Sequence, residues 1–296
     1  MIYDIRQTTT YSYASPVTYS RHVLRLTPID RAGQRVHAAA LDIAPAPIER
    51  REGGDFFGNR MTSIELDQPH DTLSVRVAAR VAVKHDALAA AYVTPDATPP
   101  WEDVRHSAFA SVDLTPNSPT HYLFASRQVS LDPEIRAYAA ESFSPGRPVL
   151  AAAIDLMRRI KADFVYEIGA TTASTTPPMS FALRRGVCQD FAHIMISGMR
   201  GLGLPAAYVS GYLRTGQSPH GDKLAGADAM HAWLLAWCGE TAGWIGLDPT
   251  NGIFAGEDHV VLAIGRDYAD VAPIDGVIFA SGGQRLAVSV SVTPVL

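Results

Sequence analysis

Three residues of this sequence carry side chains that could act together in nucleophilic catalysis: Cys188, His231 and Asp248. Cys188 follows Gly186 and lies at the predicted first turn of an apolar helix over residues 188–200. A sulfur at that position faces unpaired backbone N–H groups and the positive end of the helix dipole, which both favour the nucleophilic thiolate. Because a lone cysteine in an apolar segment is more often a structural core residue, the assignment depends on the other two residues.

His231 and Asp248 lie on two predicted strands, residues 231–238 and 244–248. If Gly239 and Glu240 form a two-residue hairpin turn, His231 lies directly opposite Asp248, at a Cβ separation of about 4.5–5.5 Å. The carboxylate could then orient the imidazole. The three residues therefore predict a nucleophile, a general base and an orienting acid. The alternative interpretation is an ordinary pair of core strands.

Other residues could assist by binding the oxyanion or the substrate. Tyr166 and the Gln189 amide are candidate oxyanion donors, in addition to the Cys188 backbone N–H. Trp233 shares a strand face with His231 and is predicted to exclude water and to line a narrow apolar slot for the substrate.

Several charged or titratable residues near these segments receive structural interpretations. Asp190, in the first helical turn, is predicted to stabilise the helix end, with its carboxylate pointing away from the sulfur. His193 lies five residues after Cys188 and is predicted to be a hydrogen-bonded structural residue. A second set could bind substrate but is expected to form a buried ion-pair network: Arg266, Asp267 and Asp270.

The elements that must position these residues divide the chain into three parts. Residues 1–100 are rich in β-branched and aromatic segments separated by turn signals, which predicts a β-sandwich-like domain. Five prolines between residues 86 and 122 (95, 99, 100, 116 and 119) disfavour long helices, and residues 101–130 are predicted to be a linker or wrapping segment. Residues 131–296 contain helical patterns at 135–142, 148–162 and 188–200, followed by strands, which predicts an α+β core of helices packed on an antiparallel sheet.

Composition excludes several classes of protein. The chain has 296 residues, 47% of them hydrophobic, and a net charge of −5, so nucleic acid and anionic membranes are not expected partners. A transmembrane run and a secretory signal pattern are not found, and two cysteines cannot form a disulfide framework. We therefore expect a cytoplasmic protein that needs no cofactor. The sequence leaves the oligomeric state open.

Four segments resemble the bacterial transglutaminase-like family, whose members are often described as transglutaminase-like proteins or cysteine proteases. They are residues 186–193 (GVCQDFAH), 231–233 (HAW), 244–252 (WIGLDPTNG) and 265–273 (GRDYADVAP), in the expected order. The resemblance covers most of the chain, including the β-rich N-terminal region, and implies a papain-like α+β core with Cys188, His231 and Asp248 as the triad. Met230 departs from the small polar residue that many relatives carry there, and we expect it to narrow the cleft.

These observations lead to a primary hypothesis and two alternatives. The first is thiol-dependent acyl transfer on an amide: hydrolysis of a peptide or isopeptide bond, with transamidation as the variant. The second is a catalytically idle binding module that keeps the fold. The third is a metal site made of Cys188, His231 and Asp248, which the absence of a closely spaced ligand pair disfavours.

Overall fold

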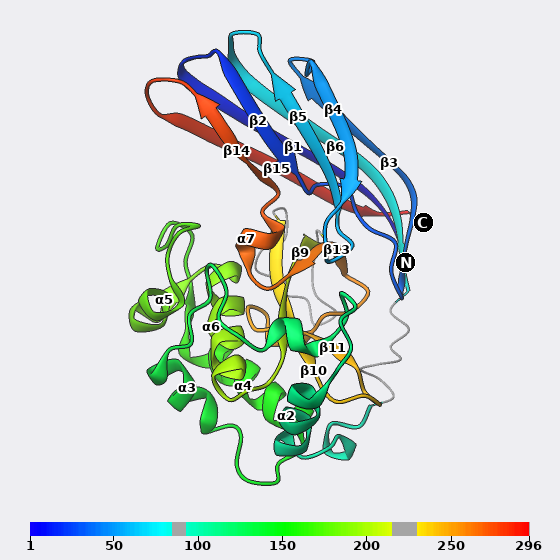
Figure 1. Ribbon diagram of the computed structural model, residues 1–296, viewed down its shortest axis with the longest axis vertical. Helices are drawn as coiled ribbons and strands as arrows, with labels where there is room; N and C mark the ends of the chain where they lie inside the picture. Colours follow the sequence, from blue (N-terminus) through cyan, green and yellow to red (C-terminus); the bar gives the residue numbers. More distant parts are fainter. Residues whose placement is uncertain (85–92, 215–229, 296) are drawn as a thin grey trace.

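The computed structural model describes residues 1–84, 93–214 and 230–295, and Figure 1 shows a β-sandwich at one end and a mixed helix and sheet core at the other. The strands of the sandwich are β1 (Ile2–Val17), β2 (Tyr19–Leu24), β3 (Gln34–Ala44), β4 (Glu49–Gly54), β5 (Arg60–Leu66), β6 (His70–Val83), β14 (Ile274–Phe279) and β15 (Gln284–Pro294). They form two antiparallel four-stranded sheets in the orders β15-β1-β6-β3 and β14-β2-β5-β4. Alternating apolar residues of both sheets pack between them, among them Leu24, Ile64 and Val75.

The second part consists of helices packed on an antiparallel sheet. Its strands are β7 (Val165–Tyr166), β8 (Arg185–Gly186), β9 (Ala206–Leu213), β10 (Met230–Trp237), β11 (Trp244–Asp248), β12 (Ile253–Phe254) and β13 (His259–Gly265). Its helices are α2 (Trp101–Ala110), α3 (Pro133–Ala140), α4 (Val149–Asp163), α5 (Pro177–Leu183), α6 (Cys188–Gly201) and α7 (Tyr268–Val271), with short 3-10 helices η1 (Pro95–Ala97) and η2 (Pro119–Tyr122). The main sheet has the order β12-β11-β10-β9-β13. The fold is thus α+β, as predicted.

Helix α6 lies at the centre of this core, surrounded by α3, α4 and α5 (Figure 1). Nearly all of its residues from Asp190 onward are buried, as the missing polar face predicts. α4 turns its apolar residues toward the same cluster, and Asp132 caps α3 by accepting the N–H groups of Glu134 and Ile135. Among the described residues, no helix is both long enough and apolar enough to cross a bilayer.

The C-terminal strands overturn one predicted boundary. We expected residues 131–296 to belong to the core, but β15 pairs with β1 and β14 pairs with β2. The chain therefore leaves the sandwich after β6, builds the core, and returns after α7 to complete both sandwich sheets. Local strand patterns predict the strands themselves, but the partner of a strand is set by contacts far away in sequence, which the patterns do not contain.

The segment between the two parts contains a helix that the prolines had argued against. α2 spans ten residues and begins directly after Pro100, which occupies the N-cap position. Beyond α2, the segment wraps over the core as predicted: the Asn117 carbonyl accepts the Trp244 indole N–H, and the Gln128 N–H donates to Asp267. Pro99 and Pro100 precede α2, and Pro116 and Pro119 follow it, so no proline interrupts the helix.

The sandwich is joined to the core along the outer edge of β13. The Gln34 side-chain amide donates to the Val261 carbonyl and accepts the Val261 N–H, each at 2.8 Å. The Asn59 amide pairs in the same way with the carbonyl and N–H of Ile264, each at 2.7 Å. These two side chains take the place of a neighbouring strand. The outward backbone N–H and C=O groups of Val261 and Ile264 are thus hydrogen-bonded by the sandwich.

Candidate active site

Cys188 is half-buried and is the first residue of α6. The chain reaches it from α5, which ends at Arg184 in a left-handed conformation with φ of 53°, through the short strand β8. Among the described residues, no hydrogen-bond acceptor is found for the backbone N–H groups of Cys188 and Gln189. The sulfur therefore lies at a helix N-terminus whose first two backbone N–H groups are free to donate.

Asp190 fixes this helix end. Its Oδ2 accepts the Val187 N–H at 2.8 Å and the Thr171 hydroxyl at 2.6 Å, so the carboxylate caps the helix, as predicted. A Cβ at residue 186 would lie only 2.5 Å from the same oxygen, so the position requires glycine. Burial raises the pKa of Asp190, while the hydrogen bonds from Thr171 and Val187 oppose that rise.

The strands β10 and β11 bring His231 and Asp248 together, but not in the predicted register. Trp237 pairs with Trp244 and Leu235 with Gly246, because residues 238–243 form a longer connection than the expected two-residue turn. The register is shifted by two residues, which leaves His231 and Asp248 on the same face as diagonal neighbours rather than opposite each other. Even so, His231 Nε2 lies 2.9 Å from Asp248 Oδ2, and both side chains are fully buried.

The Asp248 carboxylate accepts five hydrogen bonds. Oδ1 accepts the backbone N–H groups of Thr250 and Asn251, so the chain after β11 folds into a turn around this oxygen. Oδ2 accepts the Asn251 side-chain amide at 2.8 Å, His231 Nε2 at 2.9 Å and His259 Nε2 at 3.2 Å. Such a set of donors holds a buried carboxylate both ionised and fixed in orientation.

His231 and Asp248 each stabilise the charged form of the other. Burial alone would lower the pKa of His231, but the Asp248 charge and hydrogen bond, together with the Cys188 side chain, raise it to about 10. Burial alone would raise the pKa of Asp248, but His231 and then His259 hold it well below its usual range. The other imidazole nitrogen, His231 Nδ1, is buried and lacks a hydrogen bond of standard geometry to a described residue. This nitrogen is therefore available to the Cys188 sulfur or to a substrate.

The assisting residues differ in how well they fit the roles predicted for them. Tyr166 is half-buried, and burial followed by the charge of Cys188 raises its pKa to about 12, so its hydroxyl stays protonated near the sulfur. The Gln189 side-chain amide donates to the Ala173 carbonyl at 3.1 Å, which leaves its backbone N–H as the donor for an oxyanion.

Trp233 does not fit the substrate contact that we predicted. Its side chain is 1% exposed, and its ring lies over Gly211, where a Cβ would come within 2.5 Å of it. The indole packs edge-on against His259 with ring centroids 5.1 Å apart, and stacks beside His231. The wrapping segment and the sandwich cover the face of the core sheet that carries Trp233, so the indole is closed off from solvent. Its role is to pack against the two imidazole rings.

The remaining predicted residues have structural roles. His193 is buried, accepts the Tyr268 N–H at 3.2 Å, and has a pKa lowered to about 4 by burial. Arg266 pairs with Asp270 at 2.8 Å on a partly exposed surface rather than in a buried network. Asp267 joins no ion pair with a described residue; it caps α7 through the Ala269 N–H and accepts the Gln128 N–H.

Met230, which we expected to narrow the cleft, packs against the sandwich. The Gln7 amide of the sandwich lies 3.6 Å from the Met230 sulfur, and the side chain packs against two apolar clusters that include sandwich residues. The residue before His231 therefore contributes to the junction between the two parts of the molecule.

Three buried residues have the types and the spacing of a metal-binding group: His231, Asp248 and His259, whose ligand atoms lie within 4.8 Å of one another. However, His259 Nδ1 accepts the Gly256 N–H, so its proton is on Nε2, the atom that would have to bind the metal. The donor set therefore fits a hydrogen-bond network rather than a metal centre. The metal site considered from the sequence, Cys188 with His231 and Asp248, does not form such a group among the described residues.

Comparisons with known proteins agree with this architecture. Residues 136–249 match the model of the transglutaminase-like superfamily, and residues 3–82 match the bacterial transglutaminase-like N-terminal region. An uncharacterized protein of Mycobacterium tuberculosis is 38% identical over 99% of this chain and 92% of its own length. The chain belongs to the transglutaminase-like superfamily.

Two further relatives extend this result. A crystal structure of a candidate cysteine protease from Cytophaga hutchinsonii superposes with a TM-score of 0.74 at 23% identity, covering all of this chain and 91% of that one, which shows a shared fold. A protein-glutamine gamma-glutamyltransferase of Pseudomonas aeruginosa is 31% identical over 146 residues, 43% of this chain and 22% of that protein. The superfamily match includes the positions of Cys188, His231 and Asp248.

Sequence reasoning missed two residues of this transglutaminase-like site. Asn251 lies within the quoted 244–252 segment, where an Asp-Pro-Thr-Asn run signals a side-chain-capped turn. His259 gave no signal, because a histidine at the start of an apolar strand is ordinary, and β10 and β9 separate β13 from the strand of Asp248 in the sheet.

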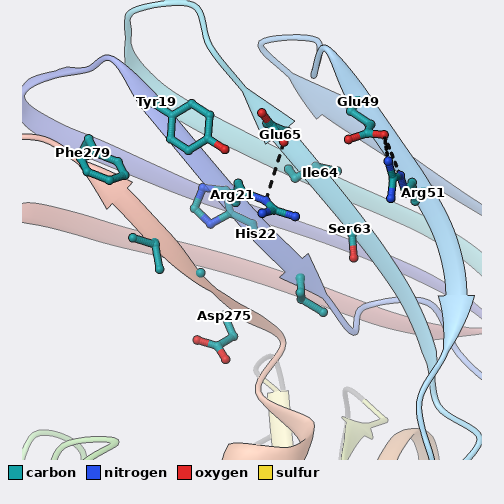
Figure 2. A pocket seen from close by; sticks show the side chains of 13 residues that line it. Tyr19, Arg21, His22, Glu49, Arg51, Ser63, Ile64, Glu65, Asp275 and Phe279 are labelled. Atoms are coloured by element: carbon teal, nitrogen blue, oxygen red, sulfur yellow. Dashed lines mark hydrogen bonds and ion pairs between the residues drawn. The ribbon is translucent and has the colours of Figure 1, made fainter.

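A hollow lies on the outer face of the sandwich sheet that contains β2, β5 and β14 (Figure 2). Four of its charged side chains form two ion pairs: Arg21 lies 3.7 Å from Glu65, and Arg51 pairs with Glu49. Tyr19 packs edge-on against Phe279 at its rim. Asp275 also lines the hollow, on β14.

Proposed function

We propose that this chain is a thiol-dependent amide hydrolase in which Cys188 is the nucleophile, His231 the general acid and base, and Asp248 the residue that orients the imidazole. The buried 2.9 Å contact between His231 Nε2 and Asp248 Oδ2 carries the proposal, because it leaves Nδ1 as the nitrogen that can exchange a proton. Membership of the transglutaminase-like superfamily supports thiol-dependent acyl transfer in general.

The steps follow from the placement of the protons. The Cys188 thiolate attacks the amide carbonyl carbon, and the carbonyl oxygen becomes an oxyanion. The imidazolium Nδ1–H of His231 then gives its proton to the leaving amine, the C–N bond breaks, and a thioester remains. Neutral His231 next takes a proton from water, whose oxygen attacks the thioester, and the acid product and the thiol are released.

The oxyanion requires donors that are free before the substrate binds. The backbone N–H groups of Cys188 and Gln189 meet this requirement, and the protonated Tyr166 hydroxyl is the third candidate. All three lie on β7 or at the start of α6, elements held together by the parallel pairing of Tyr166 with Gly186. The same elements therefore position the nucleophile and the oxyanion donors.

Water and an amine are the two possible acceptors of the acyl group. We propose water, because hydrolysis requires no dedicated site for a second substrate. We propose a peptide or isopeptide amide as the target. A transamidase would instead consume an added primary amine and form a new amide in the same assay.

The test compares wild type with three variants on a panel of peptide amides, with and without a primary amine. Cys188→Ala and His231→Ala are expected to abolish turnover with the fold intact by circular dichroism. Asp248→Asn should keep a trace, with kcat reduced on the order of 10⁴-fold, because the imidazole loses its orientation. Equal turnover in all variants would exclude the triad. A thiol that is inert to alkylation would instead favour the idle binding module.

A further inference from the structure

We infer that His259 is a positioning residue of the site, which holds the Asp248 carboxylate in line with His231 by donating its Nε2–H to the same oxygen. This inference rests on the proposed function. His259 is the first residue of β13, is 1% exposed, and has its Nε2 3.2 Å from Asp248 Oδ2. His231 Nε2 approaches that oxygen at 2.9 Å.

The backbone determines which nitrogen of His259 carries the proton. The Gly256 N–H donates to His259 Nδ1 at 3.1 Å, so Nδ1 must present a lone pair. A neutral imidazole with an acceptor at Nδ1 has its proton on Nε2, where it can only donate to Asp248. A cationic ring would place an N–H against the N–H of Gly256. The loop therefore selects the neutral, Nε2-protonated form.

The reaction depends on the His259 imidazole being neutral. Asp248 carries one negative charge, and the His231 imidazolium of the proposed mechanism is the cation that this charge must stabilise. A second imidazolium on the same oxygen would divide that stabilisation and disfavour protonation of His231. His259 as a neutral donor restrains the carboxylate without adding a competing charge.

The surroundings of His259 leave it little freedom to move. Its ring packs edge-on against Trp233. Its backbone N–H donates to the Gly256 carbonyl, so two hydrogen bonds join Gly256 and His259 across the turn 256–259. The neighbouring Asp258 accepts the Tyr3 hydroxyl and pairs with Arg214 at 3.3 Å. The charged and titratable groups around the ring are thus His231 and Asp248 on one side, and Asp258 on its own turn with Arg214, which follows β9.

Two substitutions of His259 test the roles of its two ring nitrogens separately. His259→Asn places an amide oxygen near the Nδ1 position, where it can still accept from Gly256, but removes the donor at Nε2. His259→Gln instead places an N–H group near the Nε2 position. Both side chains are polar, so a buried polar atom is present in each. His193→Asn is the matched control, since His193 is also a buried histidine that accepts a backbone N–H.

Two readouts are measured for each protein: the pH dependence of Cys188 alkylation by iodoacetamide, and kcat and KM on a peptide amide. We expect His259→Asn to lower kcat by about tenfold or more with KM nearly unchanged, and to move the acid limb of alkylation to higher pH. His259→Gln should recover most of both effects, and His193→Asn should shift neither. A merely structural role would lower stability without moving the pH profile.

The outcomes distinguish this inference from the proposed function. If wild type shows the low-pH thiolate limb and His259→Asn keeps it unchanged, His259 does not position Asp248. The same conclusion follows if His259→Gln and His259→Asn lose equal activity. If wild-type Cys188 alkylates only as an ordinary thiol, the proposed function itself fails. Should His259→Asn not fold, His259→Gln with wild-type kcat and alkylation profile supports the inference, and His259→Gln with a tenfold loss overturns it.

Discussion

At the scale of single residues, the charge of Asp248 sets the protonation range of His231. Burial would lower the pKa of His231, and the interactions with Asp248 and Cys188 raise it to about 10. The imidazolium is therefore present throughout the neutral range and is lost only as the pH rises through about 10. A general acid with this range can protonate a leaving amine at neutral pH.

Asp248→Asn removes that charge and keeps the side-chain shape. Only the interactions with Cys188 then oppose the effect of burial on the pKa of His231, so the alkaline limb of kcat/KM or of Cys188 alkylation should move from about pH 10 toward neutral pH. A pH titration of alkylation measures the shift. Asp270→Asn is the control, because it removes one carboxylate that pairs with Arg266 instead. An alkaline limb that stays in place in Asp248→Asn contradicts the assigned charge pair.

The site residues that sequence reasoning found are those with local signals. Cys188 follows a glycine at a helix start, and His231 and Asp248 share a strand face, a relation that survives the two-residue error in register because the side-chain period is two. Trp233 was placed on the correct face but assigned to the substrate, since alternation cannot tell which side of a sheet another domain covers. His259 could be found only from the three-dimensional structure, because two strands separate β13 from the strand that carries Asp248.

At the scale of elements, the connection into α6 is tightly packed. Gly186, Val187 and Asp190 form a closed arrangement in which the carboxylate accepts the Val187 N–H and leaves no space at residue 186. The helix end and the sulfur thus have one position relative to β10. Sequence patterns predicted α6 and its first turn, but not α5 or β4, which are short and contain glycine or proline.

Gly186→Ala tests this arrangement. Its Cβ would meet Asp190 Oδ2 at 2.5 Å and Cγ at 2.8 Å, so Asp190 must move and the Val187 N–H loses its acceptor. We expect unfolding stability to fall by about 1–3 kcal/mol and Cys188 alkylation at low pH to slow at least severalfold. Gly53→Ala, on exposed β4 with no atom within 4 Å, is the control for the substitution itself. Wild-type stability and alkylation in Gly186→Ala would show that the helix end tolerates a shift of Asp190.

At the scale of the whole molecule, the sandwich and the core behave as one structure in the contacts they share. The Gln34 and Asn59 amides close the edge of β13, and the Tyr212 hydroxyl donates to Gln7. A shared apolar cluster joins Tyr3 and Val81 to Val260 on β13. Because β13 also begins with His259, the sandwich supports the strand that reaches Asp248.

This coupling predicts that damage in the sandwich unfolds the core. Gln34→Ala leaves the buried N–H and carbonyl of Val261 without their amide partners, a loss of about 1–3 kcal/mol. The tryptophans are Trp101, Trp233, Trp237 and Trp244, all outside the sandwich, so their fluorescence reports on the core alone. In urea, Gln34→Ala should therefore shift the midpoint of the tryptophan fluorescence transition to a lower urea concentration, by an amount that corresponds to the whole loss of stability, while the transition stays single.

Arg51→Ala is the control. Its side chain, on β4, is 75% exposed, and the substitution should leave the urea midpoint unchanged within error. A tryptophan midpoint that does not move in Gln34→Ala would mean that the two parts unfold independently, and the catalytic sheet would then hold His259 without help from the sandwich.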